Sequence, residues 1–219
     1  MNIAQFLDLF DFPFCLNIAD GITCLVSCCG MTEENKRMDD WALEWLKFRK
    51  GDRAAFQRIY DFFFDRLYQY GYKLTQQSDL LEDCIQELFL SLYVNRNNLS
   101  ESVNLEFYLL KALKLTIYGK LRKESRFLDI ADVSGFSFRS EFVAETEFGE
   151  TQNDERIEKV KEYLEKLNPK SREILYLKFY TNLDYREIGE VLGIQSASVK
   201  KQVYRIMSKM KNVLGNQEL

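Results

Sequence analysis

Short polar and basic side chains gather on one predicted helix near the end of the 219-residue chain. Short residues at the start of a helix let its backbone approach the edges of DNA bases, while Lys and Arg neutralise phosphates. This pattern predicts a DNA-contacting helix. Its predicted contact residues are Ser196, Ala197, Ser198, Lys200, Lys201, Tyr204 and Arg205.

The residues before this helix have the spacing of a helix-turn-helix. Asp184 and Glu187 form the pattern of a capping box, and Gly193 suits the left-handed residue that ends a helix. Gly189 is small where a second helix must cross closely. We therefore predict a helix-turn-helix over residues 184–211. A helical hairpin that binds only protein is the alternative, but it would leave the bases of the second helix without a role.

A second basic stripe lies on a helix predicted over residues 105–124. Its members recur at steps of three and four, opposite an apolar stripe that runs from Leu110 to Leu121. Bases interleaved with an aromatic side chain suit a nucleic-acid backbone with an exposed base stacked nearby. A solvated basic helix gives the same pattern. The predicted nucleic-acid set here is Lys111, Lys114, Tyr118, Lys120, Arg122 and Lys123.

An acidic stripe lies on a helix predicted over residues 78–94. Asp79, Asp83 and Glu87 recur at intervals of four, and no Lys or Arg occurs between residues 75 and 95. Like charges at this spacing destabilise an isolated helix by a few tenths of a kcal/mol per pair. We therefore predict that the stripe, which also includes Glu82 and Gln86, binds a basic partner. An ordinary solvated face is the alternative.

Composition favours an all-α fold. Only two prolines occur, Pro13 and Pro169, and 46% of the residues are apolar. Apolar residues recur at helical spacing from Arg53 to Leu74, in addition to the two helices above. Asn168 and Pro169 predict the start of a further helix that extends to about Tyr180.

The net charge of −4 conceals strong segregation of charge along the chain. Residues 109–127 carry six bases and one acid, whereas residues 129–155 carry eight acids and one base. We predict two small helical domains, the second a helix-turn-helix, joined by an acidic flexible linker. The predicted boundaries are 1–30 for an atypical N-terminal extension, 31–125 for the first domain, 126–155 for the linker and 156–219 for the second domain.

Residue types also argue against catalysis and metal binding. The chain has no His, five Cys, and no phosphate-cradling glycine loop or nucleophile motif. Cys84 lies in an apolar helical stripe and is predicted to be a buried thiol. Cys24, Cys28 and Cys29 have no fourth metal ligand at a sensible spacing. We predict no catalytic residue, no metal and no cofactor.

The N-terminal thirty residues differ from the rest. They carry three Asp and no base, so they lack the positive region of a signal peptide. Residues 25–28 resemble a lipoprotein cleavage site, but again without a basic region. The apolar run at 22–29 is too short to span a bilayer, and we expect no membrane insertion. We expect a cytoplasmic protein whose functional part begins near Met31.

These constellations, in this order, resemble the small two-domain extracytoplasmic-function (ECF) sigma factors of bacterial RNA polymerase, within the sigma-seventy family. The segment Glu82-Asp83-Cys84-Ile85-Gln86-Glu87-Leu88-Phe89 is similar to the family's core-binding motif. The remaining matches lie at residues 51–56, 107–123, 167–173 and 185–200.

The resemblance implies partners and a role for each surface. Asp79, Glu82, Asp83, Gln86 and Glu87 would bind core RNA polymerase. The 105–124 helix would contact and help to melt the −10 element of promoter DNA, and the helix that carries residues 196–205 would contact the −35 element. The acidic linker would thread through the polymerase. An anti-sigma factor is a further partner that the family implies.

One departure from the family concerns Lys114-Leu115, where the family often has Arg-Asn. The missing Asn puts a family-based inference about −10 base preference in doubt, though not the melting role. Two alternatives remain open at this stage. A stand-alone helix-turn-helix regulator would leave the acidic stripe unexplained, and a sigma-like mimic that binds an anti-sigma protein would not need the basic recognition helix.

Overall fold

The computed structural model describes residues 41–101, 104–124 and 155–215, and within these ranges the regular structure is entirely helical. The predicted all-α class is confirmed. The N-terminal extension 1–30, the start near Met31 and all but the last residue of the acidic linker 126–155 lie outside the described residues.

The first half of the fold is built on three long helices. α3 (Arg53–Thr75) and α4 (Ser78–Val94) pack against each other, and α5 (Leu105–Glu124) packs on both. These three helices confirm the ranges expected from the apolar periodicity. A preceding helical stretch at 41–49 and the 3₁₀ turn η1 (Arg96–Asn98) complete the described part of this half.

A close approach of α3 to its neighbours depends on Gly71. A Cβ placed there would lie 2.2 Å from Leu81 of α4 and 3.4 Å from both Leu113 and Ile117 of α5. The three helices therefore meet at this glycine, and a larger residue would require the end of the Leu81 side chain to move.

The second half comprises α6 (Glu155–Glu165), α7 (Pro169–Leu175), α8 (Tyr185–Leu192) and α9 (Ser196–Gly215). Asn168 caps α7 by accepting from the backbone N–H of Ser171 at 2.8 Å, as predicted. The chain continues from α7 through the π-helical turn η5 (Tyr176–Tyr180), so the expected extent to Tyr180 is confirmed.

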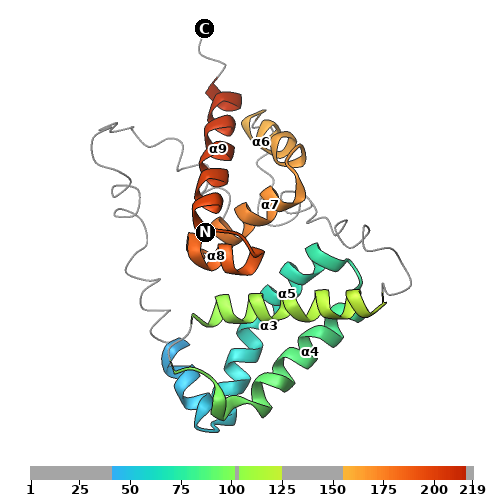
Figure 1. Cartoon of the computed structure of the whole chain (residues 1–219), viewed down its shortest axis with the longest axis vertical. Helices are drawn as coiled ribbons and strands as arrows, with labels where there is room; N and C mark the ends of the chain where they lie inside the picture. The colour runs from blue at the N-terminus through green and yellow to red at the C-terminus, as the bar shows by residue number, and fades with distance from the viewer. Residues whose placement is uncertain (1–40, 102–103, 125–154, 216–219) are drawn as a thin grey trace.

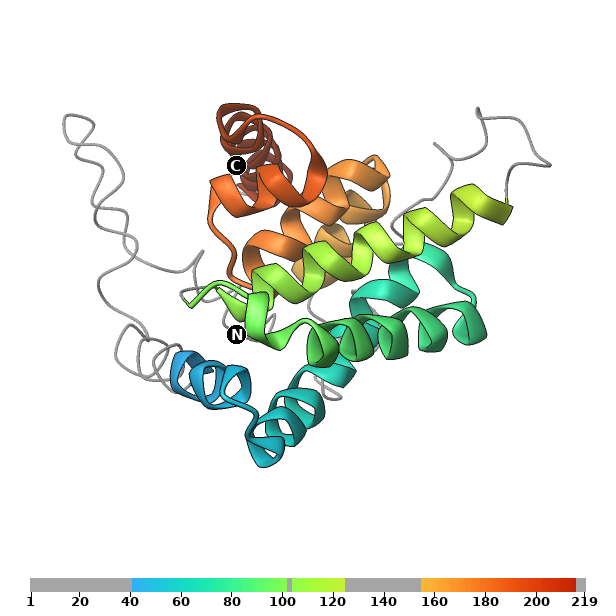
Figure 2. The ribbon, with the colours of Figure 1, turned by 60° about the horizontal axis from the view of Figure 1, so that its bottom comes forward.

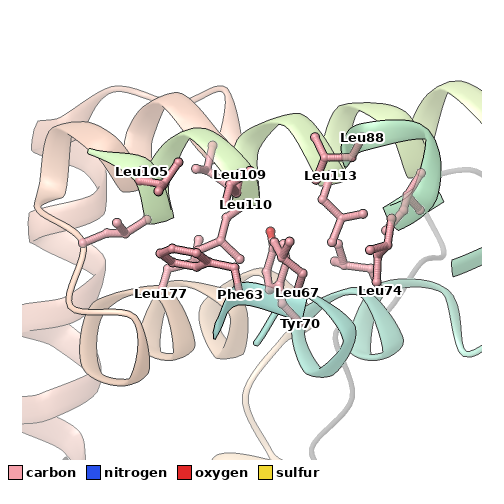
Figure 3. Close-up of a cluster of buried hydrophobic side chains, with 14 of the residues drawn as sticks. Phe63, Leu67, Tyr70, Leu74, Leu88, Leu105, Leu109, Leu110, Leu113 and Leu177 are labelled. Carbon is pink, nitrogen blue, oxygen red and sulfur yellow. The ribbon is translucent and has the colours of Figure 1, made fainter. Parts of the chain in front are cut away.

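One apolar core runs through both halves. In Figure 2, α5 lies between α4 and the C-terminal helices, and α3 also contacts the C-terminal half, where the Tyr70 ring stacks on that of Tyr176. Figure 3 shows leucines of α5 above Phe63 and Leu67 of α3, with Leu177 from η5 in the same cluster. Cys84 is fully buried in this core, as predicted. The two halves thus share apolar surface, and the division into two domains stays a prediction.

The helix-turn-helix forms as the sequence predicts. Asp184 accepts from the backbone N–H of Glu187 at 2.7 Å, and the Glu187 carboxylate accepts from the backbone N–H of Asp184 at 2.9 Å. Gly193 ends α8 with a φ of 64°, in the left-handed region that favours glycine. Val199 and Val203 are buried and anchor α9 beneath the turn.

We predict that Gly189→Ala destabilises the helix-turn-helix. An added Cβ would lie 2.6 Å from the backbone carbonyl oxygen of Ile194, so the turn must shift. The free energy of unfolding should fall by about 1–3 kcal/mol in urea denaturation. Gly119→Ala is the matched control, since a Cβ there meets nothing within 4 Å, and it should leave stability unchanged or raise it by up to about 1 kcal/mol. Equal effects at the two sites would contradict the steric account.

Candidate nucleic-acid interface

The outer face of α9 is open to solvent. All seven predicted contact residues, from Ser196 to Arg205, are exposed, and Tyr204 is 76% exposed. Their outward orientation follows from the burial of Val199, Val203 and Ile206 on the opposite side. The helix therefore presents short polar residues at its N-terminus and three bases along the next two turns. Such a surface suits base edges and phosphates.

The acidic stripe on α4 is also exposed. Asp79, Glu82, Asp83, Gln86 and Glu87 all face solvent, because the other side of the helix is buried against α3 and α5. α4 itself contains no Lys or Arg, but a lysine of α5 lies next to the acidic stripe.

Lys120 of α5 lies 3.3 Å from the Glu87 carboxylate, where the side chain of Glu87 is 61% exposed. This ion pair corrects the expectation of an unneutralised stripe. Sequence periodicity cannot show it, because it joins two helices.

The outer face of α4 also carries two exposed apolar residues that were not predicted from the sequence. Leu90 and Val94 are each 65% exposed, and their spacing continues that of Asp83 and Glu87 along α4. In a helix that also buries Leu88, Phe89 and Leu92, such residues look like further core positions. Only their helical phase, which matches the acids, could have placed them on the outer face. Acidic and apolar side chains together form one continuous α4 face.

The basic stripe of α5 is not uniformly exposed. Arg122 and Lys123 near its end face solvent, whereas Lys111, Tyr118 and Lys120 are half-buried. Lys114 departs most from the expected surface stripe, because it is buried with a side-chain exposure of 8%. The C-terminal half covers this part of α5, as Figure 2 shows.

The carboxylate of Glu173 on α7 binds Lys114. Its Oε1 atom accepts from the Lys114 ammonium at 2.7 Å and from the Tyr70 hydroxyl at 2.7 Å, and the Glu173 side chain is also 8% exposed. Burial, followed by the nearby Glu173 charge, raises the pKa of Tyr70 well above its usual range, so Tyr70 stays a donor. Burial and the same carboxylate raise the pKa of Tyr118 to about 12.

Two glutamates of α8 bind the remaining donors on this side of α5. The Lys111 ammonium lies 2.8 Å from the Glu190 carboxylate, and the Asn104 side-chain amide donates to Glu187 at 2.7 Å. The hydrogen bond from Lys111 lowers the pKa of Glu190, with a smaller contribution from Arg186. Glu187 therefore caps α8 with one oxygen and binds the residue that precedes α5 with the other.

Comparison with known proteins identifies the family. The family model described as "Sigma-70 region 2" matches residues 59–127, and "Sigma-70, region 4" matches residues 157–210. The chain is 31% identical over 164 residues to the ECF RNA polymerase sigma factor SigW of Bacillus subtilis (strain 168), which covers 72% of this chain and 87% of that protein. The chain belongs to the ECF sigma factor family.

A second curated relative and one solved structure are also similar to this chain. The sigma factor is 23% identical over 154 residues to the ECF RNA polymerase sigma factor SigM of the same organism, which covers 70% of this chain and 91% of that protein. Among solved structures, the sigma factor RpoE in complex with the anti-sigma factor NepR from Bartonella quintana matches with a TM-score of 0.48 and 18% identity. That match covers 74% of this chain and 98% of the RpoE chain.

Family membership defines the activity: the protein is a sigma factor that directs RNA polymerase to promoters. The region 2 match includes α4 and α5, and the region 4 match includes α8 and most of α9. Within the described ranges, the sigma factor has no helix long and apolar enough to cross a membrane. The same residues contain no group of three or more acidic or cysteine side chains that could hold a metal ion.

The glutamates that cover α5 in this sigma factor were not predicted from the sequence. Glu173, Glu187 and Glu190 are separated from α5 by about fifty residues or more, so no short-range pattern joins them to it. Glu187 did give a signal as a capping residue, but a cap needs only one of its two carboxylate oxygens. The contacts of these glutamates with Asn104 and α5 depend on how the two halves of the chain pack together.

Proposed function

We propose that this sigma factor uses three surfaces in initiation: α4 for core polymerase, α5 for the −10 element and α9 for the −35 element. The observation that carries the proposal is the separation of charge on the exposed helices. The outer face of α9 has Lys200, Lys201 and Arg205, while the outer face of α4 has acids and no base. Opposite charges on two exposed faces suit two different partners.

For α9 the proposed partner is the DNA major groove. Ser196, Ala197 and Ser198 lie at the N-terminus of the helix, where side chains are short enough for the backbone to approach base edges. Lys200, Lys201, Tyr204 and Arg205 would contact phosphates and bases along the groove.

For α5 the proposed role is contact with the −10 element and support of its melting. Lys111, Lys114, Tyr118, Lys120, Arg122 and Lys123 supply the positive charge and the stacking ring. Leu115, where the family often has Asn, is 64% exposed on this helix. An apolar side chain there cannot form the hydrogen bonds of an amide, so we expect a −10 preference different from that of relatives with Asn.

For α4 the proposed partner is a basic, partly apolar surface of core polymerase. Asp79, Glu82, Asp83, Gln86 and Glu87 would supply electrostatic complementarity, and Leu90 and Val94 would supply apolar contact. Exposed apolar side chains next to a charged stripe are typical of a binding surface.

The proposal also covers the wider setting of the protein. Promoter recognition needs no catalytic group or cofactor of the sigma factor's own, and it takes place where polymerase works, in the cytoplasm. We extend the proposal to a functional division at 31–125 and 156–219, joined by the linker 126–155. An anti-sigma protein is proposed as a further partner on family grounds.

We predict that Asp83→Lys weakens binding to core polymerase at least about tenfold, because like charges would then face each other across a charged interface. Glu87→Lys should also weaken binding to core polymerase, and it additionally removes the ion pair between Glu87 and Lys120. Affinity for purified core enzyme would be measured by fluorescence anisotropy at two salt concentrations. Glu162→Lys on α6 is the control, because it reverses the same charge at an exposed site elsewhere. Unchanged core affinity for Asp83→Lys would refute the role of the α4 face.

We predict that the protein with core polymerase gives discrete run-off transcripts from fragmented genomic DNA. Lys200→Ala and Arg205→Ala should each weaken promoter binding and reduce its dependence on salt by about one released counterion. Lys166→Ala removes the same charge from an exposed site just after α6 and should leave transcripts unchanged. DNA binding without core enzyme, and no transcripts with it, would indicate a stand-alone regulator instead.

A further inference from the structure

The exposed face of α5 is apolar at its centre. Leu115 is 64% exposed, and Gly119, which follows it by one helical turn, is exposed as well. Arg122 and Lys123 lie on the next turn and are also exposed. Figure 1 and Figure 2 show the last turns of α5 extending beyond the helices of the C-terminal half. The accessible part of α5 therefore combines an apolar centre with a basic end.

Two polar side chains next to Leu115 have partners within the protein. The Thr116 hydroxyl donates to a backbone carbonyl of the preceding turn at 3.0 Å. Lys111, one turn before Leu115, lies 2.8 Å from the Glu190 carboxylate. One turn after Leu115, Gly119 has no side chain. The surface around Leu115 thus offers a ligand methyl groups and bare helix backbone.

Gly119 leaves space on the outer side of α5. A Cβ there would meet nothing within 4 Å, so no residue that the structure describes requires glycine at this position. Glycine in a helix interior is less stable than alanine, because it loses more conformational freedom on folding. What glycine provides is a bare backbone that a ligand can approach closely. Its position next to Leu115 indicates close approach by a molecule outside the chain.

Promoter DNA is the occupant that the surrounding residues favour. α5 lies within the match to sigma-70 region 2, and Arg122 and Lys123 supply positive charge for phosphates beside Leu115. The Leu115 side chain has no donor or acceptor, so it cannot distinguish bases through hydrogen bonds. Apolar side chains that read DNA contact the C5-methyl group of thymine. An exposed leucine with basic neighbours on a DNA-contacting helix therefore suits thymine.

We propose that Leu115 is a specificity residue that selects thymine at one position of the −10 element, with the C5-methyl group packed on the Leu115 side chain over Gly119. The proposal rests on the proposed contact of α5 with the −10 element, and it adds which base is selected and through which group. Arg122 and Lys123 hold the neighbouring phosphates, which position the strand without reading its sequence.

Replacement of thymine by deoxyuridine tests this contact, because it removes the C5-methyl group and keeps every hydrogen-bonding group of the base. The probe is the DNA fragment that gives the strongest run-off transcript, with each thymine of its −10 region replaced in turn. Affinity is measured by competition with the holoenzyme, which is core polymerase with the full chain. We expect one position at which the replacement weakens binding about threefold to fivefold, the effect of one buried methyl group.

Variants at Leu115 show whether this residue reads the methyl group. Leu115→Ala and Leu115→Asn should bind the thymine and deoxyuridine probes equally, whereas Leu115→Met keeps the apolar contact and should keep the wild-type ratio. Gly119→Ala should also lose the preference without losing thermal stability, because its Cβ holds the base away. Leu43→Ala is the matched control. It truncates a leucine that is 53% exposed on the helical stretch 41–49, and it should keep the wild-type ratio.

Two outcomes would overturn the proposal: no thymine of the −10 region is sensitive to the loss of its methyl group, or Leu115→Ala keeps the wild-type ratio. Failure of the proposed role of α5 gives a different result. Unchanged affinity of both Arg122→Ala and Lys123→Ala for every probe would refute the contact of α5 with the −10 element. Weaker binding by these two variants, with no effect of Leu115 on the ratio, would leave that contact standing and refute only the selection of thymine.

Discussion

The buried carboxylate of Glu173 is the interaction on which the arrangement of the two halves depends. It accepts from an ammonium of α5 and a hydroxyl of α3 through one oxygen atom, at 2.7 Å each. The Glu173 side chain is only 8% exposed, and a buried carboxylate is costly unless it is paired and hydrogen-bonded. Glu173 therefore fixes α7 to two helices of the first half at once.

The same interaction also shows that part of the basic stripe on α5 binds acidic side chains of the protein itself. As a sequence pattern, five bases and Tyr118 at helical spacing indicate a nucleic-acid surface. In the folded chain, part of that stripe neutralises the protein's own glutamates, and Lys120 neutralises Glu87 of α4. Arg122 and Lys123, at the C-terminal end of the stripe, are exposed to solvent. In a protein with a net charge of −4, the basic residues predicted on the outer face of α9 are all exposed.

Local features were predictable from the sequence because short-range sterics and hydrogen bonds decide them. The capping box of Asp184, the left-handed Gly193 and the crowded Gly189 each depend on residues within a few positions. The outer faces of α4 and α9 followed from helical periodicity for the same reason. The burial of Lys114 depends on which helices meet across the chain, and periodicity within one helix holds no information about that.

The most direct test of the central claim is to measure how readily the two halves meet with and without Glu173. In a chain whose N-terminal cysteines are replaced by Ser, Lys111→Cys and Glu190→Cys would place thiols at a contact that now measures 2.8 Å between charged atoms. Cys84 is buried. A short bismaleimide would then join α5 to α8, and the rate of cross-linking would be measured by gel electrophoresis. We predict that Glu173→Ala slows this cross-linking several-fold, because it leaves the buried Lys114 ammonium without its partner, whereas Glu162→Ala on α6 leaves the rate unchanged. Equal rates with and without Glu173 would show that this carboxylate does not hold the halves together, and would contradict the account.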